Sequence, residues 1–174
     1  MKNENKIFVK NNLTLEKKNS IFDIGIDVKA ISVNIIGEKY IDNTYFSVDY
    51  IEYDTGIFLD SIKRNSLEKE EQIYTLVYAR SSISKKNLYL HNGVGLIDPN
   101  YRDSIKLRFA YKAQPKDYKI IGDSLAIQID ESKIYKIGDK IGQLVFVKSF
   151  PIHFEYVPEL IPSDRGGGFG STGI

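Results

Sequence analysis

Apolar and polar residues alternate along several short stretches of the chain. Every second position is apolar in four such stretches, residues 24–30, 105–111, 125–129 and 152–156. A period of two places successive side chains on opposite faces of an extended strand, so each stretch predicts a half-buried strand. Leu125 and Ile127 would lie on the buried face of the third. Two denser apolar runs, residues 74–79 and 143–148, favour strands that are covered on both faces.

Turn signals separate these stretches at short intervals. Glycine, aspartate, asparagine and proline cluster at residues 54–56, 92–93, 97–100 and 137–139. Many short strands with such turns are typical of a sandwich or a barrel, so we expect an all-β fold of one of these kinds. The one helical candidate is residues 66–72, whose charged composition is equally consistent with a solvated loop.

The last residues of the chain differ in kind from the rest. Glycine and small polar residues dominate residues 162–174, which predicts a flexible arm. The 174 residues are otherwise enough for one domain with a real core. We therefore expect one β domain over residues 1–161 and a glycine-rich C-terminal arm over residues 162–174.

Composition excludes several kinds of chemistry. The chain has no cysteine, which removes disulfides, thiolate zinc sites and cysteine nucleophiles. His91 and His153 are its two histidines, too few for a catalytic zinc site built from several. A net charge of +1 gives no electrostatic footprint for a nucleic-acid polymer or a membrane. The polar N-terminus and the lack of an apolar run of about 20 residues predict a soluble, cytoplasmic protein.

Three polar segments carry the candidate chemistry: residues 80–82, 90–101 and 165–173. Taken singly, each has a plain structural reading. Arg-Ser-Ser after a strand is typical of a turn, Asp98-Pro is typical of a type I turn, and a glycine-rich tail is typical of a flexible one. The residue types also suit phosphate, because the Arg80 guanidinium is a fork of donors and serine adds hydroxyls.

The order of these segments resembles the five motifs of the trimeric dUTPases. Residues 24–28 resemble the family's Ala-Gly-Tyr-Asp-Leu, residues 80–82 its Arg-Ser-Gly, and residues 92–101 its hairpin Asn-x-x-Gly-Val-Ile-Asp-x-x-Tyr. Residues 138–144 and 165–173 are similar to the fourth and fifth motifs. The resemblance implies the family's compact β-barrel or jelly-roll-like fold, a homotrimer with shared active sites, and hydrolysis of dUTP to dUMP and pyrophosphate with Mg²⁺.

The resemblance also implies a role for individual residues. Asp98 would orient and deprotonate the water that attacks the α-phosphorus, with Gln143 close to that water, and Asp27 would reach Mg²⁺ through water. Asn92 would read uracil, Tyr101 would pack on the deoxyribose, and the arm would close over the nucleotide. The residues implied to contact substrate are Arg80, Ser81, Ser82, Asn92, Gly95, Tyr101, Arg165, Phe169, Gly170, Ser171 and Thr172.

The chain departs from the family pattern at a few positions. Three glycines, residues 166–168, separate Arg165 from Phe169 where the family usually has four residues. Asp103 replaces a glycine, and Lys140 and Gly142 stand where arginine and alanine are commoner, in positions that favour a structural role. Two stretches are longer than usual, residues 63–72 and 112–132.

Two other functions compete with this interpretation. The dCTP deaminases share the fold and an Arg-Ser-Ser pattern, but they need a glutamate in the strand after the hairpin, where this chain has Arg108. A non-catalytic regulator would keep the fold and bind nucleotide or a protein partner through the long stretches. Release of pyrophosphate from dUTP with Mg²⁺ separates the three.

Overall fold

The computed structural model describes residues 8–10, 23–60, 73–150, 152–159 and 161. The arm at residues 162–174 and the helical candidate at residues 66–72 lie outside the described residues. Fourteen strands and three short 3-10 helices make up the described elements. They are β1 (Phe8–Lys10), β2 (Ile26–Lys29), β3 (Ser32–Ile36), β4 (Lys39–Ile41), β5 (Thr44–Tyr45), β6 (Tyr50–Asp54), β7 (Phe58–Asp60), β8 (Ile73–Ala79), η1 (Ser81–Lys85), β9 (Leu88–Leu90), β10 (Gly95–Ile97), β11 (Lys106–Tyr111), η2 (Pro115–Asp117), β12 (Tyr118–Ile121), β13 (Ser124–Gln128), η3 (Glu131–Lys133) and β14 (Lys140–Lys148).

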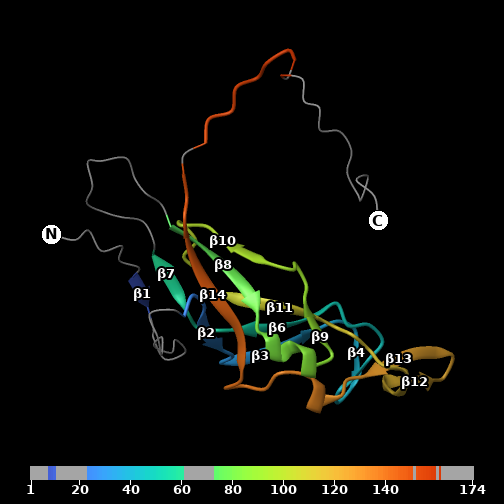
Figure 1. The fold of residues 1–174 in the computed structure, drawn as a ribbon. Coiled ribbons are helices and arrows are strands. Elements are labelled where there is room, and N and C mark those ends of the chain that lie inside the picture. The colour runs from blue at the N-terminus through green and yellow to red at the C-terminus, as the bar shows by residue number, and fades with distance from the viewer. Residues whose placement is uncertain (1–7, 11–22, 61–72, 151, 160, 162–174) are drawn as a thin grey trace, which may run out of the picture.

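The strands form antiparallel sheets, as the alternating sequence predicts (Figure 1). Three sheets have four strands each, in the orders β10-β8-β14-β2, β3-β6-β11-β9 and β12-β13-β5-β4, and β1 pairs with β7. The expected all-β fold is confirmed. No described helix is long or apolar enough to cross a membrane.

Strand β14 organises the first sheet because it pairs along its length with β8 and at one end with β2. Gln143 lies opposite Tyr78 of β8 and opposite Asp27 of β2. The register shifts between Lys140 and Gly142, which is a bulge in the pairing with β2. Segments far apart in sequence, around residues 27, 80 and 143, are thereby brought to one end of the sheet.

The core lies between the inner faces of the first two sheets. Ile105, Leu107 and Phe109 have at most 2% of their surface exposed, as the alternation in residues 105–111 predicts. Phe109, Tyr53 and Tyr135 pack edge to face, with ring centroids 5.6–6.1 Å apart. Burying each such ring contributes about 1.5–3 kcal/mol through the hydrophobic effect.

Gly142 has a packing reason in this core. A Cβ at this position would lie 2.5 Å from Leu107 Cδ2 and 3.0 Å from the Tyr78 carbonyl oxygen. Leu107 therefore fills the space that a methyl group would need. The glycine that stands where alanine is commoner in the resembling motif is thus matched to its neighbour on β11.

Several expectations about strands need correction. Leu125 is exposed and Ala126 is buried, so β13 presents the opposite face to the one expected there, and Ile24 is exposed. The two dense runs are not fully covered, since Tyr78 of β8 is 37% exposed. A strand is buried on both faces only where other elements cover both faces of its sheet. The pattern of apolar residues within one strand does not show whether such elements are present.

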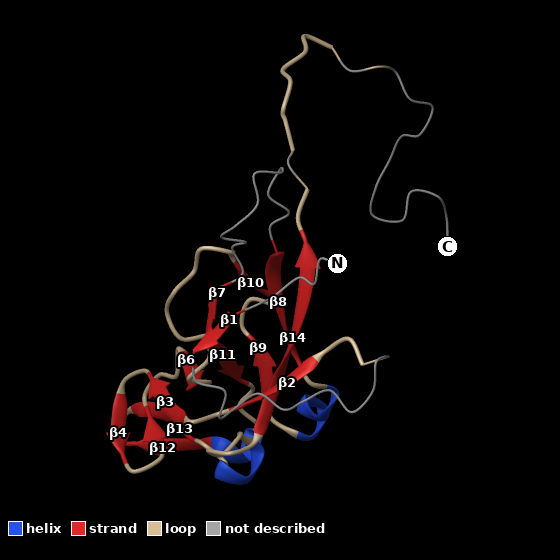
Figure 2. Ribbon diagram, turned by 90° about the vertical axis from the view of Figure 1, so that its left-hand side faces the viewer, coloured by secondary structure: helices blue, strands red, loops and turns tan. Residues whose placement is uncertain are grey.

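Residues 152–156 form no strand, which is the largest error. Ile152, Phe154 and Tyr156 are 73%, 86% and 98% exposed. The chain leaves the body of the sheets after β14 and runs away from it (Figures 1 and 2). A strand needs a neighbour to complete its hydrogen bonds, and within the described residues this segment has none.

The long stretch at residues 112–132 folds onto the body. It forms η2, the hairpin of β12 and β13, and η3, and β13 pairs with β5 (Figure 2). The Tyr111 hydroxyl donates to Asp117 at 2.8 Å and accepts from the Asp130 N–H at 3.0 Å, tying both ends of the stretch together. The pKa of Tyr111 is raised to about 12, mainly because its hydroxyl is removed from water.

Candidate functional site

Four polar side chains meet at the end of the sheet that β14 organises. Asp27 Oδ1 accepts a hydrogen bond from Arg80 Nε at 2.9 Å and another from Gln143 Nε2 at 3.1 Å. Asp27 Oδ2 lies 3.2 Å from Lys140 Nζ. We call these residues, Asp27, Arg80, Lys140 and Gln143, the Asp27 cluster. Three of them are predicted site residues, and the register of β14 explains why they meet.

Lys140 was not predicted as a site residue. In a regular strand Lys140 and Gln143, three positions apart, point to opposite faces of the sheet. The bulge between Lys140 and Gly142 shifts the register and brings both side chains to Asp27. No sequence pattern predicts that bulge, so the contact between Lys140 and Asp27 could not be predicted from the sequence.

The Asp27 cluster suits an anion. It has two cationic side chains and one carboxylate, so its net charge is positive, and these three side chains are partly exposed. Arg80 uses Nε for Asp27, which leaves its two terminal amino groups to bind other acceptors. Oxyanions such as phosphate match this donor set.

Ser81 and Ser82 follow Arg80 in the short helix η1. The turn is closed by bonds from Ile83 N to the Arg80 carbonyl at 3.0 Å and from Ser84 Oγ to the Ser81 carbonyl at 3.0 Å. Ser81 is exposed and Ser82 is half-buried. The structure therefore places the predicted phosphate-binding residues 80–82 at the edge of the Asp27 cluster.

Tyr135 lies beneath this turn. Lys86, just after η1, donates to the Ile134 carbonyl at 2.7 Å and lies 5.5 Å from the Tyr135 ring centroid. The Tyr135 hydroxyl is buried and has no hydrogen-bond partner of good geometry within the described residues. Burial raises the pKa of Tyr135, and the nearby Ser82 side chain and Arg80 charge oppose that rise.

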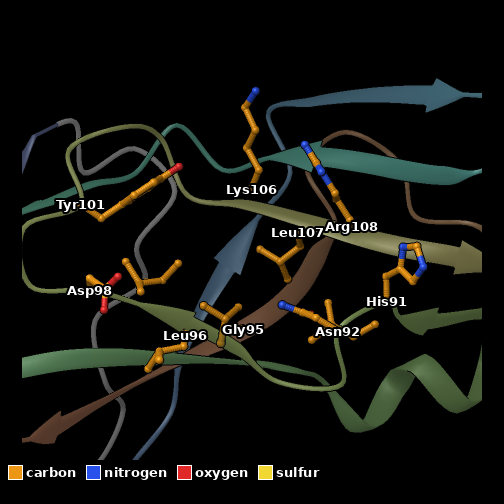
Figure 3. A pocket seen from close by; sticks show the side chains of 12 residues that line it. His91, Asn92, Gly95, Leu96, Asp98, Tyr101, Lys106, Leu107 and Arg108 are labelled. Carbon is orange, nitrogen blue, oxygen red and sulfur yellow. The ribbon is translucent and has the colours of Figure 1, made fainter.

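A second feature is a cavity of about 500 Å³ between the hairpin at β10 and strand β11 (Figure 3). Its lining includes Asn92, Gly95, Asp98 and Tyr101, four predicted site residues that the structure brings together. Apolar side chains such as Val77 and Leu107 form other parts of the wall. A mixed apolar and polar cavity of this size suits a small organic ligand.

Local turns shape the cavity. Gly93 has φ = +69°, a conformation that favours glycine, and lets the chain reverse after Asn92. A Cβ on Gly95 would lie 3.1 Å from Val77 Cβ and 3.6 Å from Asn92 Nδ2. The glycine therefore keeps backbone close to the cavity, where a side chain would take up the space.

Asp98 and Tyr101 are joined by the second turn. The Tyr101 N–H donates to the Asp98 carbonyl at 3.1 Å, as expected for the predicted type I turn. The Tyr101 hydroxyl donates to the Ser104 carbonyl at 3.2 Å, which fixes its ring over the cavity. Asp98 is exposed, and its carboxylate makes no hydrogen bond or ion pair with any described residue.

The rim of the cavity is basic. Lys106 and Arg108 both bind Glu52, at 3.2 Å and 2.8 Å, and the Arg108 guanidinium lies 4.5 Å from the Tyr50 ring centroid. Burial raises the pKa of Glu52, but the bonds from Arg108 and Lys106 outweigh it and hold the pKa below its ordinary value. Figure 3 shows the Lys106 side chain pointing away from Asp98.

Asp98 and the Asp27 cluster lie toward opposite ends of β8, although the cavity itself extends along the strand to Val77. Ile97, next to Asp98, pairs with Thr75, whereas Arg80 directly follows the other end of the strand. At about 3.3 Å per residue, the step from Thr75 to Arg80 is about 16 Å. The structure therefore does not bring Asp98 and Arg80 of one chain together. Arg165, Phe169, Gly170, Ser171 and Thr172 lie outside the described residues.

Comparison with known proteins identifies relatives by sequence. The Finegoldia magna deoxyuridine 5'-triphosphate nucleotidohydrolase is 31% identical over 170 residues, 97% of each chain. The Desulfitobacterium hafniense protein of the same name is 38% identical over 100 residues, 56% of each chain. The match to the Legionella pneumophila one is 33% over 106 residues and covers 59% of that protein. The aligned part thus spans little more than half of these last two relatives, and no protein-family profile matches the chain.

Solved structures agree on the fold. The dUTPase of Staphylococcus bacteriophage 80alpha superposes with a TM-score of 0.67 at 20% identity, over 98% of this chain and 100% of that one. A point mutant of that phage protein gives a TM-score of 0.66 with the same coverage. At this identity the likeness concerns the fold, and it agrees with the jelly-roll-like fold that the family resemblance implied.

Proposed function

The chain belongs to the dUTPase family, and we propose that it hydrolyses dUTP to dUMP and pyrophosphate. The observation that carries the proposal is the cavity itself. Asn92, Gly95, Asp98 and Tyr101, which match the family's nucleoside hairpin, all line one space of nucleoside size. The phage 80alpha protein, which shares the fold, was solved with the analogue dUpNHpp.

Asp98 is proposed as the general base. Its exposed carboxylate has no partner among the described residues, so it is free to accept a proton from a water molecule. The water oxygen forms a bond to the α-phosphorus while the bond from that phosphorus to the β-bridging oxygen breaks. The proton passes to Asp98 and pyrophosphate leaves. The reaction lowers dUTP and yields dUMP, the precursor for dTTP synthesis.

The Asp27 cluster is proposed to hold the phosphates. Arg80 offers its terminal amino groups, Ser81 and Ser82 add hydroxyl and backbone donors, and Gln143 lies beside them. Such catalysis depends on positioning and charge stabilisation, not on a covalent nucleophile. Arg165, Phe169, Gly170, Ser171 and Thr172 of the arm are proposed to complete the contacts.

Mg²⁺ is the proposed cofactor. The donor set fits an ion bound mainly through water and substrate phosphates, because the site offers one carboxylate, Asp27, beside phosphate-binding cations. Asp27 would accept hydrogen bonds from water in the ion's shell. When bound, the ion neutralises charge on the phosphates.

The active site is proposed to form between subunits of a homotrimer. Asp98 must reach the α-phosphorus that Arg80 helps to bind, yet about 16 Å of strand separates their ends of β8 in one chain. A hairpin from one subunit and the Asp27 cluster of the next would supply both. Closed symmetric rings make such heterologous interfaces identical at every site.

Selectivity is proposed to come from Asn92 and Tyr101. Polar groups that are left unpaired by the wrong base edge discriminate strongly, and the fixed Tyr101 ring would crowd a 2′-hydroxyl. Arg108 favours this reaction over deamination of dCTP. It stands where the deaminase needs an acid, and it is bound to Glu52 at 2.8 Å.

One assay tests the proposal. The purified full chain with Mg²⁺ should convert dUTP to equal amounts of dUMP and pyrophosphate, with dCTP, dTTP and UTP at least about 100-fold slower in kcat/KM. Turnover of dCTP at the dUTP rate, or formation of a uridine product from it, would contradict the proposed pocket. Addition of EDTA should remove activity and chromatography should show a trimer.

A further inference from the structure

Asp27 has more partners than a water-mediated contact to a metal ion requires. Its Oδ1 accepts from Arg80 at 2.9 Å and from Gln143 at 3.1 Å, and its Oδ2 lies 3.2 Å from Lys140. Both oxygens of the carboxylate are therefore engaged by side chains. Arg80 and Gln143 are also the groups that the proposed function assigns to the phosphates.

We propose that Asp27 is a latch on the phosphate-binding cations. A triphosphate must displace the Asp27 carboxylate from Arg80 and Lys140, and the released Lys140 becomes a further phosphate ligand. The inference rests on the proposed function only for the identity of the anion. It gives a binding role to Lys140, which stands where the resembling motif usually has arginine.

Charge makes the exchange favourable. Ion pairs between partly exposed side chains are individually weak, and Asp27, Arg80 and Lys140 are 19%, 28% and 34% exposed. Asp27 presents one negative charge to the cations, whereas a triphosphate presents several at similar distances. Coulomb attraction grows with the product of the charges, so the nucleotide outcompetes the carboxylate.

Geometry makes the exchange possible. Lys140 lies at the bulge of β14, with a flexible side chain that is partly open to solvent. Arg80 is held through Nε alone in its bond to Asp27, so its terminal amino groups can contact phosphate before the latch opens. Release of Asp27 then leaves its carboxylate free to face water in the shell of a cation.

Asp27→Asn gives the sharpest test. The amide keeps the shape but loses the negative charge, so position 27 no longer competes with the anion for Arg80 and Lys140. Calorimetry in EDTA with dUpNHpp should give a Kd about fivefold to tenfold lower than wild type. Asp123→Asn, an exposed acid in the turn between β12 and β13, is the matched control and should leave Kd unchanged. An unchanged or higher Kd for Asp27→Asn overturns the latch.

Lys140→Met tests the second half. If Lys140 moves to phosphate, this variant should raise the metal-free Kd about fivefold, and the loss should persist in the Asp27→Asn background. Lys140→Arg should restore wild-type affinity. Lys119→Met, on exposed β12, is the control for the loss of one cation. If Lys140 merely holds Asp27, its removal will have no effect in the Asp27→Asn background, and its role as a phosphate ligand is refuted.

Inorganic tripolyphosphate separates this inference from the proposed function. It lacks base and sugar, so the same order of affinities, Asp27→Asn tightest and Lys140→Met weakest, should appear with it. If that order appears but dUTP is not hydrolysed, the latch is supported and the proposed dUTPase activity is refuted. If dUTP is hydrolysed normally but that order does not appear, the activity is supported and the latch is refuted. Thermal melts of each variant confirm that the compared proteins are folded.

Discussion

Two carboxylates, Asp27 on β2 and Asp98 just after β10, lie toward opposite ends of β8 and differ in their surroundings. Asp27 is bound on both oxygens by Arg80, Gln143 and Lys140. Asp98 is exposed on a cavity wall, without a hydrogen bond or ion pair to its carboxylate within the described residues. The comparison distinguishes an acid that organises other groups from one that is free to take a proton.

The two acids also owe their places to different parts of the structure. Asp98 is placed by a local turn, which is closed by the hydrogen bond from the Tyr101 N–H to the Asp98 carbonyl. Asp27 is placed by the pairing of β2 with β14, more than a hundred residues away in sequence. A local motif therefore positions the proposed base, while long-range register assembles the proposed phosphate site.

Asp98→Asn should have the largest effect. Removing the base is expected to lower kcat by about 10²–10⁴-fold, while Kd for dUpNHpp stays within about tenfold, because the Asp27 cluster is intact. Steady-state kinetics and calorimetry on the same preparation measure both. Asp103→Asn, an exposed acid in the same loop, should retain activity. Ordinary turnover by folded Asp98→Asn protein would reverse the assignment of the two acids.

A mixed trimer tests whether the two ends of β8 serve one substrate from different chains. Asp98→Asn and Arg80→Ala proteins should each be nearly inactive alone. Unfolded together and refolded as an equal mixture, they should regain about a quarter of wild-type activity, because a good hairpin meets a good phosphate site at that fraction of interfaces.

Mass spectrometry must confirm that such trimers are mixed. Mixing the folded proteins without refolding is the control and should recover little. Confirmed mixed trimers that stay inactive would mean that Asp98 and Arg80 act within one chain, against the separation of about 16 Å along β8.

Tyr101→Ala should alter selectivity more than chemistry. Loss of the ring opens the place where a 2′-hydroxyl would sit, so the preference for dUTP over UTP in kcat/KM should fall by about tenfold or more. Tyr101→Phe keeps the ring and loses only the bond to the Ser104 carbonyl, so it should keep most of the preference. Equal selectivity of the alanine variant and wild type would show that the sugar is read elsewhere.

The sequence predicted what depends on neighbours along the chain. The strands around Leu107 and Leu144 follow from local apolar patterns, and the turns at Gly93 and Asp98 follow from residue type. The residues proposed for the nucleoside, Asn92 to Tyr101, lie on one cavity because a single hairpin carries most of them.

What the sequence missed depends on partners far along the chain. Lys140 reaches Asp27 through a bulge that no pattern announces. Ala126 faces inward, and Leu125 outward, because β13 pairs with β5 in that register. Residues 152–156 alternate like a strand, but alternation does not provide a neighbour to pair with.

The smallest expected effect lies beneath the Asp27 cluster, at two adjacent tyrosines. The Tyr53 hydroxyl donates to the Tyr135 carbonyl at 3.2 Å, whereas the buried Tyr135 hydroxyl has no well-formed bond to a described residue. Tyr53→Phe should therefore lower the free energy of unfolding by about 1 kcal/mol, and Tyr135→Phe should leave it unchanged or raise it slightly. Urea denaturation measures the free energy of unfolding of both variants. Each variant keeps its aromatic ring and the contact between the two rings, so the comparison isolates the hydroxyl groups. Equal losses in the two variants would show that the Tyr135 hydroxyl also forms a stabilising hydrogen bond, with the Ser82 side chain as its neighbour. The proposed phosphate site would then rest on hydrogen-bonded groups below the turn as well as at Asp27.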